Sequence, residues 1–237
     1  MIVLYLLLVF VVGYLIGNVN FARIFSLAFA KKDITTVGSK NPGTMNMLRT
    51  RGFGEAFLTL MFEAIKSGAP AIAMFFTFEH FWPGIGNVAY FLMALGTIVG
   101  HCFPVFYKFK GGKGVACTFG MFLFHPEFWW ISIIVFVGCF LLFLIIEYPF
   151  IISFVFILTM SIVATCKFAI GMVDNLVVIL FLIWMNVLLI LFMHRSNIKR
   201  LVRGKENKVN LREKIFKKKH KTEDAEQKSE VATERKE

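Results

Sequence analysis

The sequence predicts an all-α polytopic membrane protein with about seven transmembrane helices. Apolar residues make up 57% of the 237 residues, and Phe alone occurs 29 times, which is typical of a membrane protein rather than a soluble domain. The apolar residues form long uncharged runs, and about 20 such residues in a helix are enough to cross a bilayer. Turn formers and charges gather between the runs. We therefore expect a transmembrane domain over residues 1–207 that carries the activity, and a separate tail over residues 208–237.

The first apolar run, over residues 2–16, continues through Gly17-Asn18-Val19-Asn20 to Ala30. It is either one long helix whose second half turns polar, or a span followed by a short surface helix. Because the run lacks a basic start and a small-residue cleavage site, we expect it to be retained rather than removed as a signal peptide.

Six further spans are predicted, and each is set off from the next by a turn signal. They cover residues 54–78, 84–103, 114–124, 128–146, 149–168 and 175–193. Pro83, Pro104, Pro126 and Pro149 stand between successive runs, where proline and its predecessor disfavour a continued helix. The fourth run is short, which favours a broken or tilted helix.

The distribution of Lys and Arg predicts how the chain crosses the membrane. An odd number of spans puts the two ends on opposite faces. The basic loops over residues 31–51 and 108–113 then share one face with the tail that begins at Arg195. Lys and Arg are almost absent from the three opposite loops, near Glu79, Glu127 and Asp174. The excess of positive charge on cytoplasmic loops therefore predicts an outside N-terminus and a cytoplasmic C-terminus.

The C-terminal part of the chain is basic. Residues 195–237 hold 15 Lys or Arg against 8 Asp or Glu, a net charge of +7 out of +11 for the chain. From Lys208 onward the mixed charge and scarce apolar residues predict a disordered cytoplasmic tail. The partner that this charge favours is anionic lipid, where each basic residue near the surface contributes about 1 kcal/mol. We expect no nucleic-acid partner.

The most informative segment is residues 100–114, which carries His101, three lysines and a glycine cluster between two apolar runs. A charged side chain at bilayer depth costs roughly 3 kcal/mol, so such residues normally face water or a functional cavity. Glycines let backbone N–H groups approach an anion, and lysine supplies a compact positive charge that suits phosphate. The segment is therefore predicted to be a phosphate-binding loop at the membrane surface.

Two other polar clusters are expected on the same face. In residues 37–52, a helix should restart near Thr44 or Met45, and its free backbone N–H groups would lie beside Ser39 and Asn41. In the second cluster, His194 and Asn197 are three positions apart, so they share one face of a helix just after the last span.

Three motifs in these clusters resemble those of the bacterial acyl-phosphate-dependent glycerol-3-phosphate acyltransferases. They are Gly38-Ser39-Lys40-Asn41-Pro42-Gly43 with Asn46 and Arg49; Gly100-His101 with Phe109-Lys110-Gly111-Gly112-Lys113-Gly114-Val115-Ala116; and His194-x-x-Asn197-Ile198-x-Arg200-Leu201 with Gly204-x-Glu206. Their order, spacing and shared face all fit, and the similarity covers about residues 13–207.

The resemblance implies a reaction and a location. The family transfers a fatty acyl group from acyl phosphate to the 1-hydroxyl of glycerol 3-phosphate, giving lysophosphatidic acid and phosphate. We would accordingly expect a multi-pass protein of the cell membrane with its active site at the cytoplasmic face. Its partners would be acyl phosphate, glycerol 3-phosphate and membrane lipid, with no cofactor. No metal is expected, because no carboxylate cluster reaches this face. The sequence leaves the oligomeric state open.

The resemblance also implies roles for individual residues. Those that would place the glycerol hydroxyl and the acyl carbonyl are His101, Asn41, Asn197 and His194. Those that would bind substrate are Ser39, Gly43, Arg49, Lys108, Gly111, Gly112, Lys113, Ser153 and Glu206. Within this set, Ser39, Arg49 and Lys108 would hold phosphoryl oxygens, and Glu206 would orient a basic partner.

The chemistry needs no nucleophilic side chain, because acyl phosphate is already activated. Orientation of the substrates and charge stabilisation of the tetrahedral intermediate suffice. The proton of the attacking hydroxyl goes either to His101 or to the departing phosphate. The resemblance to the family favours the phosphate.

Three departures from the family pattern affect the predicted glycerol-phosphate site. Thr44-Met45 replaces the usual Ala-Thr, so the threonine hydroxyl is absent or shifted by one position. Asn18-Val19-Asn20 replaces Ser-x-Pro, and Glu147-Tyr148 replaces Arg-Tyr. Of the serines that follow that last pair in the family, Ser153 is the counterpart here.

The rival class is a transporter or a lipid-phosphate scramblase, which would carry polar residues at mid-membrane depth along several spans. This chain gathers them at one face instead. Glu63 and Lys66, at i and i+3 in the second span, are interpreted as a structural pair. The His-x4-Asp pattern of acyltransferases that use acyl-CoA or acyl carrier protein is missing, and the glycine loop lacks the spacing of a nucleotide-binding P-loop.

Overall fold

The computed structural model describes residues 1–209, and every regular element in that part of the chain is helical. The elements are α1 (Ile2–Gly17), α2 (Phe21–Ala30), η1 (Ile34–Thr36), α3 (Thr44–Thr50), α4 (Phe53–Phe81), α5 (Gly86–Cys102), η2 (Val105–Tyr107), α6 (Val115–Leu123), α7 (Trp129–Ile146), α8 (Pro149–Ile170), α9 (Leu176–Met193) and α10 (Arg195–Val202). The predicted tail lies outside the described residues apart from its first two positions.

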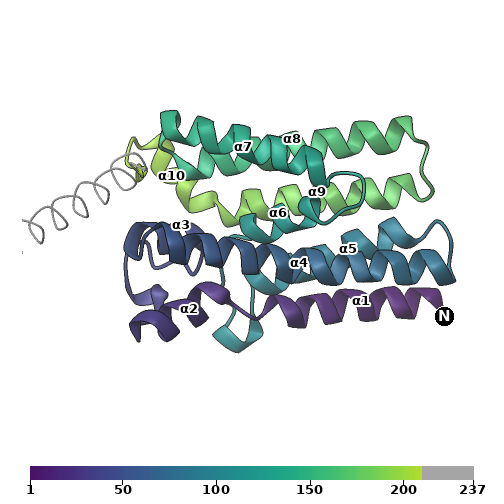
Figure 1. Cartoon of the computed structure of the whole chain (residues 1–237), viewed down its shortest axis with the longest axis horizontal. Coiled ribbons are helices and arrows are strands. Elements are labelled where there is room, and N and C mark those ends of the chain that lie inside the picture. Colours follow the sequence, from purple (N-terminus) through teal and green to yellow (C-terminus); the bar gives the residue numbers. More distant parts are fainter. Residues whose placement is uncertain (210–237) are drawn as a thin grey trace, which may run out of the picture.

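The long helices lie side by side in one bundle (Figure 1). In that view α1 forms one side, α4 and α5 lie in the middle, and α7, α8 and α9 form the other side. The short elements α2, α3 and α10 gather at one end of the bundle. The three motifs found in the sequence are carried by this end or by the loops that lead to it.

The all-α polytopic class is confirmed, but the count of seven spans is not. In the described part of the chain, six helical segments are long and apolar enough to cross a membrane, and α1 with α2 counts as one of them. The fourth predicted span is α6, with nine residues. At 1.5 Å per residue α6 is about 14 Å long, roughly half the thickness of the hydrocarbon core. Which end of the bundle faces the cytoplasm stays a prediction from the charges.

Glycines let the helices of the bundle approach each other closely. A Cβ atom at Gly17 would collide with the carbonyl oxygen of Thr97, and one at Gly100 with that of Tyr14. Helices α1 and α5 therefore pack backbone against backbone, as small residues permit in membrane proteins. A side chain at Gly120 would likewise meet the backbone of α4, so α6 is held directly on α4.

The first apolar run is a span followed by a short helix, because the chain breaks after Gly17. Asn20 accepts a hydrogen bond from the backbone N–H of Arg23 and so caps α2. The side-chain amide of Asn20 also donates to the carbonyl oxygen of Pro42, 3.1 Å away. The asparagine that departs from the family pattern thus attaches α2 to the loop of the first motif.

Candidate active site

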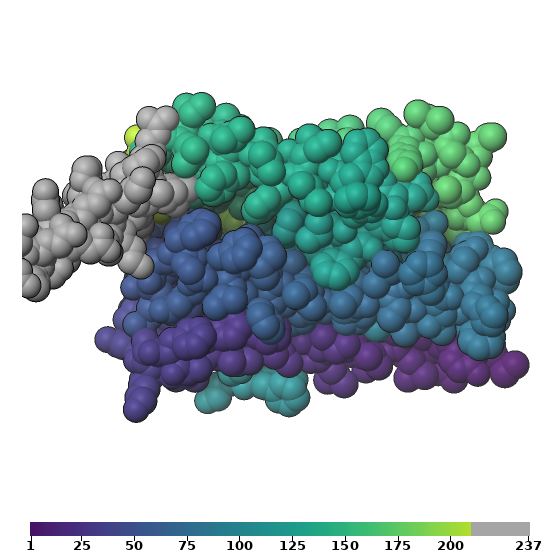
Figure 2. Space-filling view, viewed as in Figure 1, coloured from purple at the N-terminus to yellow at the C-terminus, as the bar shows by residue number. Residues whose placement is uncertain are grey.

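A cavity of about 1030 Å³ opens at the end of the bundle that carries α3 and α10. One part of its wall is polar and cationic, with Arg49, Lys110, Lys113, His194, Asn197 and Arg200. The other part runs between α4, α6, α7 and α8 and is apolar, with Phe57, Leu60, Phe119, Phe136, Phe140 and Phe156. In Figure 2 the surface is hollowed along the boundary between α4, in blue, and α7, in teal.

Asn46 shapes the loop of the first motif. Its side chain is buried, accepts a hydrogen bond from the backbone N–H of Ser39 (2.9 Å), and donates to the carbonyl oxygens of Ile34 and Val37 (both 3.0 Å). Gly38 has a φ of +59° and lies so close to Asn46 that a Cβ would collide with its side-chain oxygen. The loop that places Ser39 in the cavity wall is therefore fixed from behind by one amide side chain.

The helix predicted near Thr44 or Met45 begins at Thr44, with Gly43 as its N-cap. Both Gly43 and Thr44 line the cavity. Among the described residues the Thr44 hydroxyl oxygen is buried without a hydrogen-bond partner. A buried polar atom normally has a partner, so this hydroxyl is available to a bound substrate oxygen.

The glycine loop lies directly on His101. The N–H of Gly112 donates to the carbonyl oxygen of His101 (3.0 Å), and a Cβ at Gly112 would collide with the imidazole Nε2. A Cβ at Gly111 would collide with the same carbonyl oxygen. These two glycines are therefore required by the contact with His101, a reason that the sequence alone did not give. Gly111 lines the cavity, whereas Gly112 is not among the described residues of its wall.

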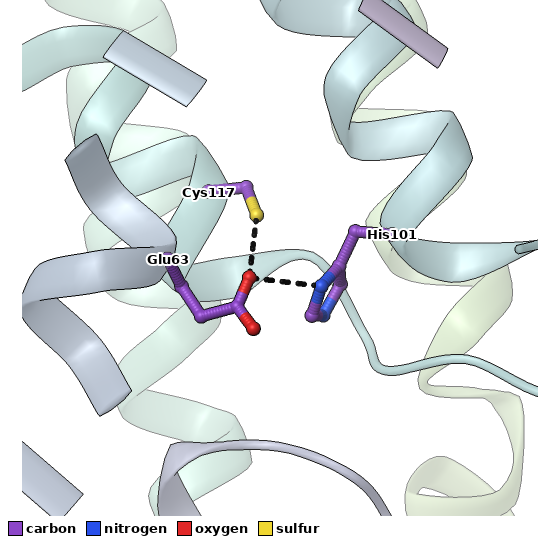
Figure 3. A group of neighbouring side chains, drawn as sticks. All are labelled: Glu63, His101 and Cys117. Carbon is purple, nitrogen blue, oxygen red and sulfur yellow. Dashed lines mark hydrogen bonds and ion pairs between the residues drawn. The ribbon is translucent and has the colours of Figure 1, made fainter. Parts of the chain in front are cut away.

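Glu63 from α4, His101 from α5 and Cys117 from α6 meet beside the cavity (Figure 3). Glu63 Oε2 lies 3.1 Å from His101 Nδ1 and accepts a hydrogen bond from Cys117 Sγ at 3.6 Å. Lys66 forms an ion pair with the same carboxylate oxygen. All four side chains are buried. The pair expected from the i, i+3 spacing is present, and His101 extends it to a cluster of ionisable groups.

This cluster has the composition of a metal site, since its three ligand atoms all lie within 4.8 Å of one another. However, the ammonium nitrogen of Lys66 already contacts Glu63 Oε2 and lies 3.2 Å from His101 Nδ1. A divalent cation bound to these atoms would lie against a positive charge in a buried environment. The geometry therefore favours Lys66 as the cation of the cluster.

Glu63 and Lys66 also bridge the break between α1 and α2. The Lys66 ammonium donates to the carbonyl oxygens of Gly17 (3.3 Å), the last residue of α1, and of Val19 (2.6 Å), two positions later. Glu63 Oε1 accepts a hydrogen bond from the N–H of Phe21 at the N-terminus of α2 (2.9 Å). A cation at the end of one helix and an anion at the start of the next satisfy backbone groups that a helix leaves unpaired.

The third motif forms a chain of polar contacts. The Lys113 ammonium donates to Asn197 Oδ1, and Asn197 Nδ2 donates to Glu206 Oε1 at 2.7 Å. Arg200 Nε donates to Glu206 Oε2 at 2.8 Å. Burial lowers the pKa of Lys113 to about 8, and the positive charge of Arg200 acts in the same direction while Glu206 opposes it. The proton on Lys113 is therefore held less tightly than on an ordinary lysine.

His194 lies next to this chain of contacts, just beyond the end of α9. Its Nδ1 is 2.9 Å from the carbonyl oxygen of Ile190, which can only accept, so Nδ1 carries the proton. Burial lowers the pKa of His194 to about 4, and the charge of Lys113 adds to this effect. His194 is therefore neutral near pH 7, with Nε2 as a hydrogen-bond acceptor.

The structure brings most of the predicted site residues to one cavity. Those in its wall are Ser39, Asn41, Gly43, Arg49, His101, Gly111, Lys113, Ser153, His194, Asn197 and Glu206. Lys108 is exposed, with a φ of +53°, and is not among the described residues of the wall. Lys110, two positions later, lines the cavity instead.

Sequence reasoning placed Lys110 in the phosphate-binding loop without a role of its own, and gave no site role to Arg200, Glu63 or Thr44; all four line the cavity. Lys110 and Arg200 were inside the quoted motifs, so their signal was available. Glu63 is an ionisable residue within an apolar span, and that feature by itself indicates a functional site. Thr44 was noted in the sequence only as a departure that shifts the family's threonine by one position, and it reaches the cavity wall because α3 begins there.

Fold and site together define a polytopic helical membrane protein with a cavity that is cationic at one end and apolar at the other. A family model described as glycerol-3-phosphate acyltransferase matches residues 7–204, and the chain belongs to that family. The glycerol-3-phosphate acyltransferase of Neisseria meningitidis serogroup C / serotype 2a is 37% identical over 202 residues, covering 84% of this chain and 94% of that protein. The Mycoplasma pneumoniae protein of the same name is 32% identical over 234 residues, covering 86% and 95%.

Two crystal structures of PlsY (YgiH), an integral membrane glycerol 3-phosphate acyltransferase, are similar in fold. The glycerol 3-phosphate form has a TM-score of 0.71 and 27% sequence identity, and the match covers 90% of this chain and 99% of that one. The lysophosphatidic acid form has a TM-score of 0.70 at the same identity and coverage.

Proposed function

We propose that the protein transfers a fatty acyl group from acyl phosphate to the 1-hydroxyl of glycerol 3-phosphate, and that the products are lysophosphatidic acid and inorganic phosphate. The observation that carries the proposal is the two-part wall of the cavity. Its cationic end suits two phosphoryl groups, and its Phe-rich end suits a fatty acyl chain. The relatives with solved structures are named for forms with glycerol 3-phosphate and lysophosphatidic acid.

In this reaction the hydroxyl oxygen of glycerol 3-phosphate attacks the carbonyl carbon of acyl phosphate. A tetrahedral intermediate forms, the bond from that carbon to the phosphate oxygen breaks, and phosphate departs. Arg49, Lys113 and Arg200 line the cavity where negative charge would develop. Fixed cations in a partly desolvated cavity stabilise such charge more than water does. We assign the phosphoryl groups to this end, together with the hydroxyl groups of Ser39 and Thr44.

The contacts of His101 support the departing phosphate as proton acceptor. Its Nδ1 is engaged by Glu63 and Lys66, and its Nε2 lies against Gly112. Neither nitrogen is set up to receive a proton from a substrate in the cavity. We therefore assign His101 to holding the glycine loop in place, and the proton to the phosphate oxygen released in the same step.

The cavity wall includes apolar residues on the outer surface of the bundle. Phe53 and Phe57 on α4 are 54% and 49% exposed, and Val137 on α7 is 50% exposed, yet all three line the cavity. In a membrane, these residues would face lipid chains. The acyl chain would accordingly enter sideways between α4 and α7 from the cell membrane, while glycerol 3-phosphate would enter from the cytoplasm at the cationic end.

A comparison of acyl donors tests the proposal. Purified protein in liposomes is expected to release phosphate and lysophosphatidic acid from acyl phosphate and glycerol 3-phosphate, and to give no product from acyl-CoA or acyl carrier protein. Equal turnover with the thioester donors, or none with acyl phosphate, would refute it. Labelling of single cysteines at positions 39, 108 and 197 tests the topology, since all three should react from the same side of the membrane.

A further inference from the structure

Three phenylalanines close the apolar end of the cavity. Phe119 on α6, Phe136 on α7 and Phe156 on α8 all line it. Their rings contact one another, with centroid distances of 4.4 Å between Phe119 and Phe136, 5.7 Å between Phe119 and Phe156, and 6.5 Å between Phe136 and Phe156. Aromatic rings at these separations form a packed cluster.

The cluster lies at the deep limit of the cavity on each of its three helices. Along α6 the lining residues run from Val115 to Phe119, and along α8 from Pro149 to Phe156. Along α7, whose direction is opposite, they run from Phe143 back to Phe136. At 1.5 Å per residue, the apolar part of the cavity therefore extends about 6 to 10 Å along each of these helices, counted from the first lining residue to the phenylalanine.

The space behind Phe119 and Phe156 is closed. Phe119 and Phe156 are only 5% and 4% exposed, so protein atoms surround both rings on their far sides. On α4, the fourth wall, the deepest lining residue is Glu63, which is held by Lys66 and His101. An acyl chain that lies between α6 and α8 can extend past Phe119 and Phe156 only by displacing a ring, and close-packed interiors resist such insertion.

Resting on the acyl-transfer function proposed above, we infer that Phe119, Phe136 and Phe156 form a floor that sets the longest acyl chain the enzyme accepts. Each methylene buried before the floor strengthens binding roughly fourfold. The first methylenes beyond the floor add no binding free energy and collide with a ring. We therefore expect kcat/KM to fall sharply when the chain becomes one or two methylenes longer than the floor allows. Phe136 is the principal determinant, because it is the only one of the three rings that is partly exposed.

The test measures kcat/KM with even-numbered acyl phosphates from butanoyl to eicosanoyl, so that chains shorter than the apolar part of the cavity are included. In the wild type, kcat/KM is expected to rise with length and then drop steeply at one length. Phe136→Ala should move the drop to longer chains, raising kcat/KM for the first rejected chain about tenfold or more. Phe136→Trp should move it to shorter chains. Affinity for lysophosphatidic acids of the same lengths should shift in parallel, which gives a readout independent of turnover.

Phe122→Ala is the matched control. Phe122 lies on α6, is fully buried and contacts Phe128, but it is not among the described residues of the cavity wall. Its truncation removes a phenyl ring, as Phe136→Ala does, and should leave the length profile unchanged. If Phe136→Ala does not fold, Phe136→Leu makes the same test with a smaller loss of volume.

An unchanged length limit in active Phe136→Ala or Phe136→Leu and in Phe136→Trp would overturn the inference, as would an equal shift in Phe122→Ala. Failure of the underlying function gives a different result, namely no turnover of any acyl phosphate by the wild type.

Discussion

The ammonium group of Lys113 donates a hydrogen bond to the side-chain oxygen of Asn197, although 84 positions separate them in the sequence. The amide nitrogen of Asn197 in turn donates to Glu206, which holds Arg200. Asn197 therefore joins the glycine loop after α5 to the segment that follows α9. Two of the cationic side chains of the cavity owe their positions to this one amide.

Asn197→Ala should accordingly impair catalysis without preventing insertion. Removing a hydrogen bond to a charged group costs about 1.5 to 3 kcal/mol, which corresponds to a loss of roughly ten- to hundredfold in kcat/KM. Phosphate release by protein purified from membranes provides the measurement. Lys199→Ala, at an exposed position of the same helix that is not among the described residues of the cavity wall, is the control. Wild-type kinetics in Asn197→Ala would contradict the role given to this bridge.

Lys113 should impose an alkaline limit on activity. Because the pKa of Lys113 is lowered to about 8, its positive charge is present below this pH and is lost as the pH rises through it. We expect kcat/KM, which reports the free enzyme, to fall above about pH 8. Lys113→Arg keeps its positive charge at these pH values, so its kcat/KM should not fall in this way.

The same shift has a consequence for stability, with the opposite sign. The unfolded chain keeps its lysine protonated up to about pH 10.4, so between pH 8 and that value it binds more protons than the folded chain. The unfavourable contribution of Lys113 to folding is therefore complete below pH 8 and disappears as the pH rises. An increase in unfolding free energy over this interval that is absent in Lys113→Arg would agree with this.

Lys66→Met should destabilise the protein strongly, by about 3 kcal/mol or more, because it leaves the Glu63 carboxylate buried without its cation. The double substitution Glu63→Gln with Lys66→Met should recover much of the loss. The Lys167–Glu127 pair is the matched control, since its side chains are 40% and 41% exposed. Lys167→Met should cost less than about 1 kcal/mol. Denaturant unfolding in micelles measures the unfolding free energy of each variant. A similar decrease in Lys66→Met and Lys167→Met would contradict the expectation that the buried pair contributes more.

Removal of the Lys66 ammonium should also turn its cluster into a metal site. Glu63, His101 and Cys117 would then be free to bind a divalent ion, whereas the wild type should keep full activity in the presence of a chelator. Cobalt added to Lys66→Ala is expected to give the absorption of a cobalt–thiolate bond, and Cys117→Ser should abolish it. Loss of wild-type turnover on chelation would show instead that the lysine is not the working cation.

Lys108→Ala tests the lysine of the motif that is not among the described residues of the cavity wall. We expect it to abolish turnover, because Lys108 matches the family motif and its long side chain can turn inward when phosphate is bound. Lys32→Ala, at another exposed lysine, should have no effect. Retained activity in Lys108→Ala together with loss of activity in Lys110→Ala would show that Lys110, and not Lys108, binds phosphate.

The helical class and the residue at which α3 begins were predictable, because apolar run length and turn residues are local properties. The number of spans was not, since α6 is a short helix held on α4 through Gly120, and this depends on contact between segments far apart in the chain. Two of the six long segments also include a break or a 3₁₀ turn, which hydropathy does not register.

For the site, residue types in motifs predicted the wall of the cavity well, but not which partner each residue serves. The pairing of Glu63 with Lys66 follows from helical spacing, whereas the arrival of His101 needs α5 to pack against α4. Asn46 illustrates the same limit. It appeared in the first motif with no assigned role, and only the folded loop shows that it holds Ser39 from behind.

The backbone contact between α1 and α5 bears on how the chain is assembled during synthesis. Helix α1 emerges first, yet the surface that accepts Gly17 belongs to a segment made only after α4 is complete. The glycine-lined side of α1 must therefore remain in lipid without its partner until α4 and α5 have both been made. A methyl group at Gly100 would leave each segment able to insert, but it would block the step that joins them.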